Sequence, residues 1–127
     1  MQATRRAFLL GGASAIAGTK LTEARTFASR PWGVAPSDRI AVGVIGCNGM
    51  GYSDLTSLLK LPEVECVALC DVDRNVLERR AQDVEQTTGT KPALYEDFRR
   101  VLDDGDIDAV VIGTPDHWHC LQMVMAC

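Results

Sequence analysis

The stretch that decides the fold is V-I-G-C-N-G-M-G, which runs from Val44 to Gly51. It follows an apolar, β-branched run and precedes a segment in which leucines recur at helical spacing. Glycines placed between a buried strand and a helix are typical of the turn that binds the phosphates of a dinucleotide, G-x-G-x-x-G. Here Asn48 stands where the middle glycine is expected, and Gly49 follows it.

Each position of this pattern has its own physical role. Gly46 allows the tight turn out of the strand, and Gly51 allows the helix to pack closely on the strand. The middle position lets the backbone approach a pyrophosphate at the N-terminus of the helix. Asn48 adds a side chain there, but Asn tolerates a left-handed backbone better than most residues. We therefore expect a working variant of the dinucleotide site, with a plain strand–helix turn as the alternative.

Strands and helices alternate along the rest of the chain. Strands are predicted over residues 39–46, 64–71, 92–95 and 107–113, and helices over 49–60, 73–88, 97–102 and from the end of the loop 114–119 to residue 127. This order predicts an α/β fold, a Rossmann-type doubly wound parallel sheet. Such a sheet commonly has two more strands, so we expect the chain to be the N-terminal part of a longer protein.

An acidic residue closes the second predicted strand at the distance that a dinucleotide site requires. Asp71 lies 20 residues after Gly51. Its carboxylate can accept hydrogen bonds from the adenosine ribose and would repel a 2′-phosphate, which favours NAD over NADP. Arg74 is near enough in sequence to accommodate that phosphate, so NADP is kept as the alternative cofactor.

The first 28 residues have the pattern of a signal peptide, with a basic start and a short apolar middle. The segment T-R-R-A-F-L (Thr4–Leu9) resembles the bacterial twin-arginine signal, with Leu10 in place of the common lysine. The resemblance implies export of the folded protein to the periplasm, with its cofactor already bound. A membrane anchor that is not cleaved and an ordinary N-terminal helix are the alternatives. Residues 29–38, rich in proline and glycine, are predicted to be a linker.

Composition excludes several classes of function. The net charge is −4, and no basic stripe indicates binding to nucleic acid.

Cys66 and Cys70 lie four residues apart in a predicted strand, roughly 13 Å at ~3.3 Å per residue, which is too far for a disulfide. Cys120 and Cys127 are also too far apart on a helix. We expect the five cysteines to be small buried apolar residues, and Cys47 to be an incidental turn residue.

The loop T-P-D-H-W-H (Thr114–His119) follows the fourth predicted strand, at the edge of the sheet where ligands bind in such folds. Two histidines and a tryptophan within six residues are unusual for a plain connector. Packing beneath a second domain is one alternative. A metal site built on Asp116, His117, His119 and Cys120 is another, but no matching ligands occur elsewhere, so no metal site is predicted.

These segments together resemble a known family. V-G-V-I-G-C-N-G-M-G, A-L-C-D-V-D, Y-E-D-F-R-R-V-L and D-I-D-A-V-V-I-G-T-P-D-H-W-H occur in the order found in the glucose–fructose oxidoreductase/inositol dehydrogenase (Gfo/Idh/MocA) family. The similarity covers residues 39–127, the predicted NAD(P)-binding Rossmann domain. The exported branch of this family typically carries a twin-arginine signal. The resemblance implies three groups of cofactor-binding residues: Gly46, Asn48, Gly49, Met50 and Gly51 for the pyrophosphate, Asp71 for the ribose, and Thr114, Pro115, His117 and His119, with Trp118 nearby, for the nicotinamide side.

The resemblance also implies a function. We expect an exported NAD(P)-dependent oxidoreductase that acts on a sugar, a sugar derivative or a cyclitol. Its catalytic lysine and histidine would lie beyond Cys127, in part within a C-terminal α/β domain, so no catalytic residue is assigned in this chain. An NAD-dependent glycosidase that oxidises its substrate transiently, and a non-catalytic Rossmann fragment, are the alternatives. The full-length protein is expected to form a homo-oligomer and to meet the membrane only through its signal segment.

Overall fold

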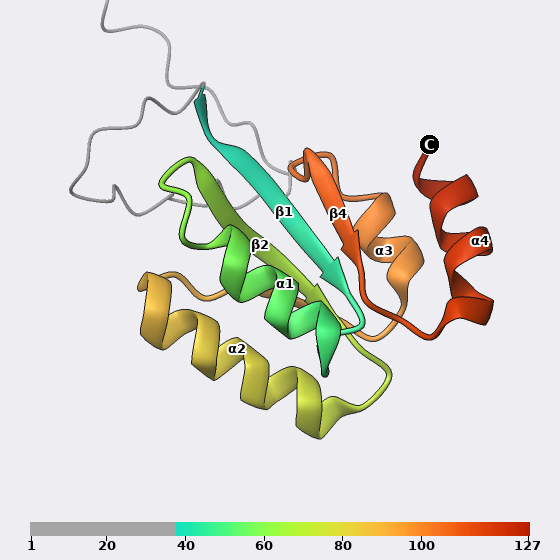
Figure 1. The fold of residues 1–127 in the computed structure, drawn as a ribbon, viewed down its shortest axis with the longest axis horizontal. Coiled ribbons are helices and arrows are strands. Elements are labelled where there is room, and N and C mark those ends of the chain that lie inside the picture. The colour runs from blue at the N-terminus through green and yellow to red at the C-terminus, as the bar shows by residue number, and fades with distance from the viewer. Residues whose placement is uncertain (1–37) are drawn as a thin grey trace, which may run out of the picture.

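Four parallel strands form a sheet in the order β3–β2–β1–β4, in a computed structural model that describes residues 38–127. Figure 1 shows β2, β1 and β4 side by side. The strands are β1 (Ile40–Ile45), β2 (Val64–Cys70), β3 (Ala93–Tyr95) and β4 (Ala109–Ile112), and the helices are α1 (Met50–Leu58), α2 (Arg74–Thr88), α3 (Phe98–Leu102) and α4 (Asp116–Ala126). The chain moves outward from β1 to β3 and then crosses back to β4 on the other side of β1. This order confirms the predicted doubly wound parallel sheet. The predicted signal peptide, and all of the predicted linker except its last residue, lie outside the described residues.

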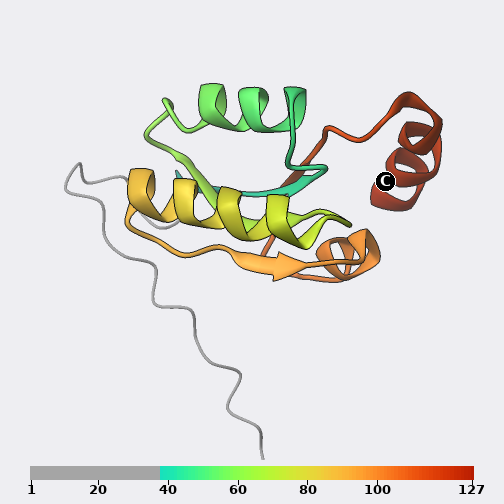
Figure 2. The same cartoon turned by 90° about the horizontal axis from the view of Figure 1, so that it is seen from below.

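Helices cover both faces of the sheet, and α1 and α3 lie on opposite sides of it (Figure 2). On one face, Leu55 from α1 and Leu77 and Val84 from α2 pack against the valines of β1. On the other face, Phe98 and Val101 from α3 pack against Ile45 and its neighbours. Every residue of β2 is buried, as expected for a strand covered on both faces. Burial of each such aliphatic side chain stabilises the fold by about 1.5–3 kcal/mol.

Two helices begin at aspartates that cap them, and α2 also ends as predicted. Asp73 accepts hydrogen bonds from the backbone N–H groups of Asn75 and Val76 at the start of α2. Asp97 accepts one from the N–H of Arg99 at the start of α3. Gly89 ends α2 with a φ of 75°, the left-handed conformation that favours glycine.

The predicted loop over residues 114–119 is wrong in its second half, because α4 begins at Asp116. Pro115 stands at the N-cap with a φ of −60°, already suited to helix entry. Asp116 in the first turn stabilises the helix through the helix dipole. His117 and His119 are therefore helical residues rather than loop residues.

The cysteines are all free, as their spacing predicts, but only Cys47, Cys66 and Cys70 are buried. Cys120 and Cys127 are exposed, which corrects the expectation that all five lie in the interior. Burial raises the pKa of each of the three buried thiols to about 12. Within residues 38–127, none of the helices has the length and apolar character needed to cross a membrane.

Candidate nucleotide-binding site

The glycine turn brings helix α1 into backbone contact with the sheet. Gly46 has a φ of 86°, and a Cβ at this position would lie 2.7 Å from the carbonyl carbon of Gly113. A Cβ on Gly51 would collide with the carbonyl oxygen of Gly46 and lie 3.2 Å from the Cα of Gly113. Because three glycine backbones meet here, no side chain separates the start of α1 from the ends of β1 and β4.

Gly49, rather than Asn48, supplies the left-handed backbone of the turn. Gly49 has a φ of 50°, and among residues 38–127 no residue other than glycine has a positive φ. The tolerance of Asn for a left-handed backbone therefore does not explain how Asn48 fits the turn. The residue with the positive φ is the one after the middle position of the motif, and it is a glycine.

The start of α1 is open. A Cβ on Gly49 would meet nothing within 4 Å, and no side chain caps the helix. The first turn carries no acidic residue, and the side chain of Met50 is 70% exposed. The first N–H groups of a helix have no partner within it, so this end presents donors and a positive dipole to an anion.

Asp71 is held in place at the end of β2 by two backbone groups. Its Oδ2 accepts a hydrogen bond from the N–H of Cys47 at 2.9 Å, and its Oδ1 accepts one from the N–H of Asp73 at 3.0 Å. The carboxylate thus joins the glycine turn to the start of α2. Each oxygen retains a lone pair that can accept a further hydrogen bond.

A cleft of about 620 Å³ opens at the carboxyl ends of the strands, a volume typical of a small-molecule site. Five predicted site residues line it, namely Gly46, Asn48, Asp71, Thr114 and Pro115. Gly49, Met50 and Gly51 do not line this cleft; they form the end of the turn and the start of α1, next to it in the chain. The sequence therefore predicts the edge of the sheet at which the cleft lies, and five of the fifteen residues that line it.

His117 and His119 do not line the cleft. His119 instead donates a hydrogen bond from Nε2 to the carbonyl oxygen of Thr114 at 2.6 Å. The hydroxyl of Thr114 donates to Oε1 of the buried Gln122 at 2.6 Å. His119 and Gln122 thus fix the conformation of Thr114 through hydrogen bonds. Gln122 and Trp118 also line the cleft, whereas His119 does not.

Sequence reasoning missed one wall of the cleft, which is formed by residues around the start of α3. The lining residues outside the predicted set are Ile45, Cys70, Val72, Glu96, Asp97, Phe98, Arg99, Gly113, Trp118 and Gln122. Glu96 and Asp97 directly follow β3, as Asp71 follows β2. Because the carboxyl ends of parallel strands share one edge, that position was the available signal. The ring of Phe98 also meets that of Trp118 edge to face, with centroids 6.5 Å apart, which joins α3 to α4.

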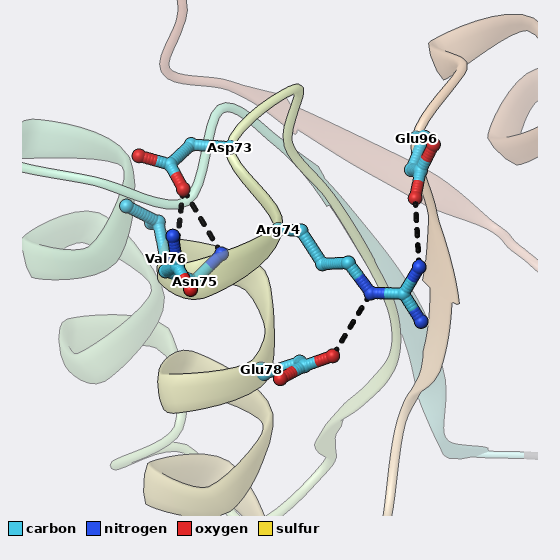
Figure 3. Close-up of polar contacts among 6 residues, drawn as sticks. All are labelled: Asp73, Arg74, Asn75, Val76, Glu78 and Glu96. Atoms are coloured by element: carbon cyan, nitrogen blue, oxygen red, sulfur yellow. Dashed lines mark hydrogen bonds and ion pairs between the residues drawn. The ribbon is translucent and has the colours of Figure 1, made fainter.

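The charged side chains of this wall are paired: Glu96 with Arg74 of α2, and Asp97 with Arg99. Arg74 donates from Nε to Glu78 at 3.0 Å, and its Nη1 lies 3.7 Å from Oε1 of Glu96 (Figure 3). The hydrogen bond and charge of Glu78, with the charge of Glu96, raise the pKa of Arg74 above its ordinary value. The N–H and the guanidinium of Arg99 lower the pKa of Asp97.

Comparison with known proteins agrees with this geometry. The family described as "Oxidoreductase family, NAD-binding Rossmann fold" matches residues 40–127. A glycosyl hydrolase family 109 protein of Shewanella baltica (strain OS155 / ATCC BAA-1091) is 36% identical over 91 residues, 68% of this chain and 20% of the relative. The alpha-N-acetylgalactosaminidase of Shewanella oneidensis is 34% identical over the same shares.

Among solved structures, myo-inositol dehydrogenase from Lactobacillus casei, in complex with NAD(H) and myo-inositol, is 30% identical with a TM-score of 0.63. The match covers 69% of this chain and 25% of that one. The chain thus spans about a fifth of the length of the curated relatives it matches. The glycine turn, the aspartate at the end of β2 and the strand order agree with this match. The chain belongs to the Gfo/Idh/MocA oxidoreductase family, and residues 40–127 form the NAD-binding Rossmann fold of that family.

Proposed function

We propose that the cleft binds NAD, with the pyrophosphate at the start of α1 and the adenosine ribose at Asp71. The fit rests on the open space around Gly49 and on the uncapped, acid-free first turn of α1. Gly46, Asn48, Gly49, Met50 and Gly51 would surround the pyrophosphate, chiefly through backbone N–H groups. Asp71, already fixed by two amides, would accept hydrogen bonds from the ribose hydroxyls.

The nicotinamide would lie toward Thr114 and Pro115, which line the cleft at the end of β4. His119 would act on this side as a positioning residue, because it holds the carbonyl of Thr114 rather than facing the cleft. His117, exposed at the start of α4, stays a proposed contact on the same side. Bound NAD would supply hydride acceptance from a carbinol carbon, and these residues would orient it.

The activity that this site supports best is an NAD-dependent oxidoreductase reaction on a sugar, a sugar derivative or a cyclitol. The aspartate that closes β2 beside an open glycine turn is the observation that carries it. The inositol dehydrogenases among the structural neighbours, solved with bound inositols, support the substrate class. The N-terminal sequence supports export by the twin-arginine route, after the cofactor has been loaded in the cytoplasm.

An NAD-dependent glycosidase is the second candidate, and the curated relatives favour it. The relative from Shewanella baltica is named a glycosyl hydrolase family 109 protein, and the one from Shewanella oneidensis an alpha-N-acetylgalactosaminidase. Such an enzyme would return the hydride to the sugar in each cycle, so NAD would be regenerated and no NADH would accumulate. Regeneration of bound NAD in each cycle suits a compartment that has no free cofactor.

The protein should be expressed from its complete reading frame and purified from the exported fraction without added cofactor. Denaturation followed by mass spectrometry is expected to release NAD in an amount close to that of the protein. NADH formation with myo-inositol would identify a dehydrogenase. Cleavage of 4-nitrophenyl N-acetyl-α-galactosaminide without net NADH would identify a glycosidase. A protein that carries no dinucleotide and binds no added NAD would refute the proposal.

A further inference from the structure

One arginine stands beside the proposed ribose site, and two carboxylates hold it. Arg74 is the first residue of α2, three residues after Asp71. Its side chain extends between Glu78 and Glu96 (Figure 3), with contacts of 3.0 Å and 3.7 Å to their carboxylate oxygens. Glu96 lines the cleft together with Asp71, whereas Arg74 does not line it. Among residues 38–127, Arg99 is the one arginine that lines the cleft, and it is itself paired with Asp97.

This pairing bears on the choice between two dinucleotides. NADP differs from NAD by a phosphate on the adenosine ribose, and a nearby arginine is the usual group that accommodates it. Glu78 and Glu96 already engage two nitrogens of the Arg74 guanidinium and offset its charge, so a phosphate must compete with them for this arginine. Glu96 also adds its own negative charge to the lining of the cleft, which contains Asp71 and Asp97.

We propose that Glu96 is a specificity-determining residue, which disfavours NADP by holding Arg74 away from the ribose 2′ position. Asp71 alone would not account for this effect, since Arg74 could otherwise offset its charge. The inference rests on the proposed function, because it assumes that the adenosine ribose lies at Asp71. Arg74, Glu78 and Glu96 are 75%, 55% and 66% exposed, so the pairing is reversible and its removal need not disturb the fold.

The test compares ligands that differ only by the 2′-phosphate. NAD, NADP, AMP and adenosine 2′,5′-bisphosphate should be titrated calorimetrically into the protein expressed from its complete reading frame and stripped of cofactor. Glu96→Gln is expected to strengthen binding of NADP and of the bisphosphate about three- to fivefold, as for an exposed ion pair. Binding of NAD and AMP should change less, so that the ratio of NADP to NAD affinity rises.

Two further variants separate the mechanism from a general effect of charge. Glu85→Gln removes the same charge from an exposed position on α2, about 16 Å along the helix from Arg74 at ~1.5 Å per residue. It should leave all four affinities unchanged. In the Arg74→Ala background, Glu96→Gln should bring no gain for the phosphorylated ligands, because the arginine that would bind them is absent.

Three results would overturn the inference. An unchanged ratio of NADP to NAD affinity in Glu96→Gln would show that Glu96 does not select the cofactor. An equal gain with and without Arg74 would show simple charge repulsion by Glu96. Wild-type protein that binds neither NAD nor AMP would refute the proposed function along with the inference, whereas NAD binding with an unchanged ratio refutes the inference alone.

Discussion

At the scale of single residues, the site depends on where side chains are absent. Gly46, Gly51 and Gly113 let three backbones meet, and the sequence predicts the first two from their pattern. Asp71 is also predicted, from its distance along the chain. The backbone of Asn48 is not, because a residue type that tolerates a left-handed conformation does not thereby adopt it. Glu96 directly follows β3, so its position indicates the edge of the cleft, but the sequence does not show that this residue lines the cleft.

Gly51→Ala tests the close approach at this scale. The added Cβ would collide with the carbonyl oxygen of Gly46, so α1 must shift away from the sheet. We expect a loss of about 1–3 kcal/mol in the free energy of unfolding, measured with urea, together with weaker NAD binding. Gly105→Ala is the matched control, because a Cβ there meets nothing within 4 Å and should change stability by less than about 0.5 kcal/mol. Equal stabilities of the two variants would contradict the packing described.

At the scale of elements, the ends of helices decide what the sequence can predict. The stretch from Asp73 to Gly89 carries a capping aspartate and a terminal glycine, and α2 begins and ends there. The start of α4 was predicted too late, although Pro115 and Asp116 are residues typical of a helix start. Local backbone chemistry was the better guide in both cases.

Asp73→Ala tests the contribution of the cap to α2. The substitution removes both hydrogen bonds to the N–H groups of Asn75 and Val76. Stability measured by chemical denaturation should fall by about 1 kcal/mol, within a range of about 0.5–2 kcal/mol. Asp73→Ser should lose much less stability than Asp73→Ala, since a hydroxyl oxygen can accept the same hydrogen bonds. Alanine and serine variants of equal stability would show that the cap contributes nothing.

At the scale of the whole molecule, alternation of strands and helices was enough to predict the sheet. The observed order β3–β2–β1–β4 is that of a doubly wound sheet, the fold that this alternation predicts. The position of Glu96 and Asp97 after β3 indicates the edge of the sheet, but the set of residues that line this wall depends on how α3 packs against β1 and β2. The fold is therefore encoded in local pattern, whereas the full outline of the cleft depends on packing between distant segments.

The buried thiols give the whole molecule a predictable response to alkali. Burial raises the pKa of Cys47, Cys66 and Cys70 from 9.0 to about 12. Between these values the thiols ionise in the unfolded chain but not in the folded one, so the free energy of unfolding should fall as pH rises above about 9. Thermal unfolding across that range would measure the slope. Cys66→Ala should reduce the slope, whereas Cys120→Ser, at an exposed position, should not. A wild-type slope no steeper than that of Cys66→Ala would contradict the assignment.

Asp71 also links two parts of the chain that are otherwise separate in sequence. Its carboxylate accepts hydrogen bonds from the backbone N–H groups of Cys47 and Asp73. One side chain therefore protects an amide in the glycine turn and an amide at the start of α2 from exchange with solvent. When this carboxylate moves away, both amides lose their partner at once, and local opening at the two segments becomes one event. A ribose that holds Asp71 in place would suppress that event, and so ligand occupancy would slow the exchange of two amides from two different loops in the same proportion.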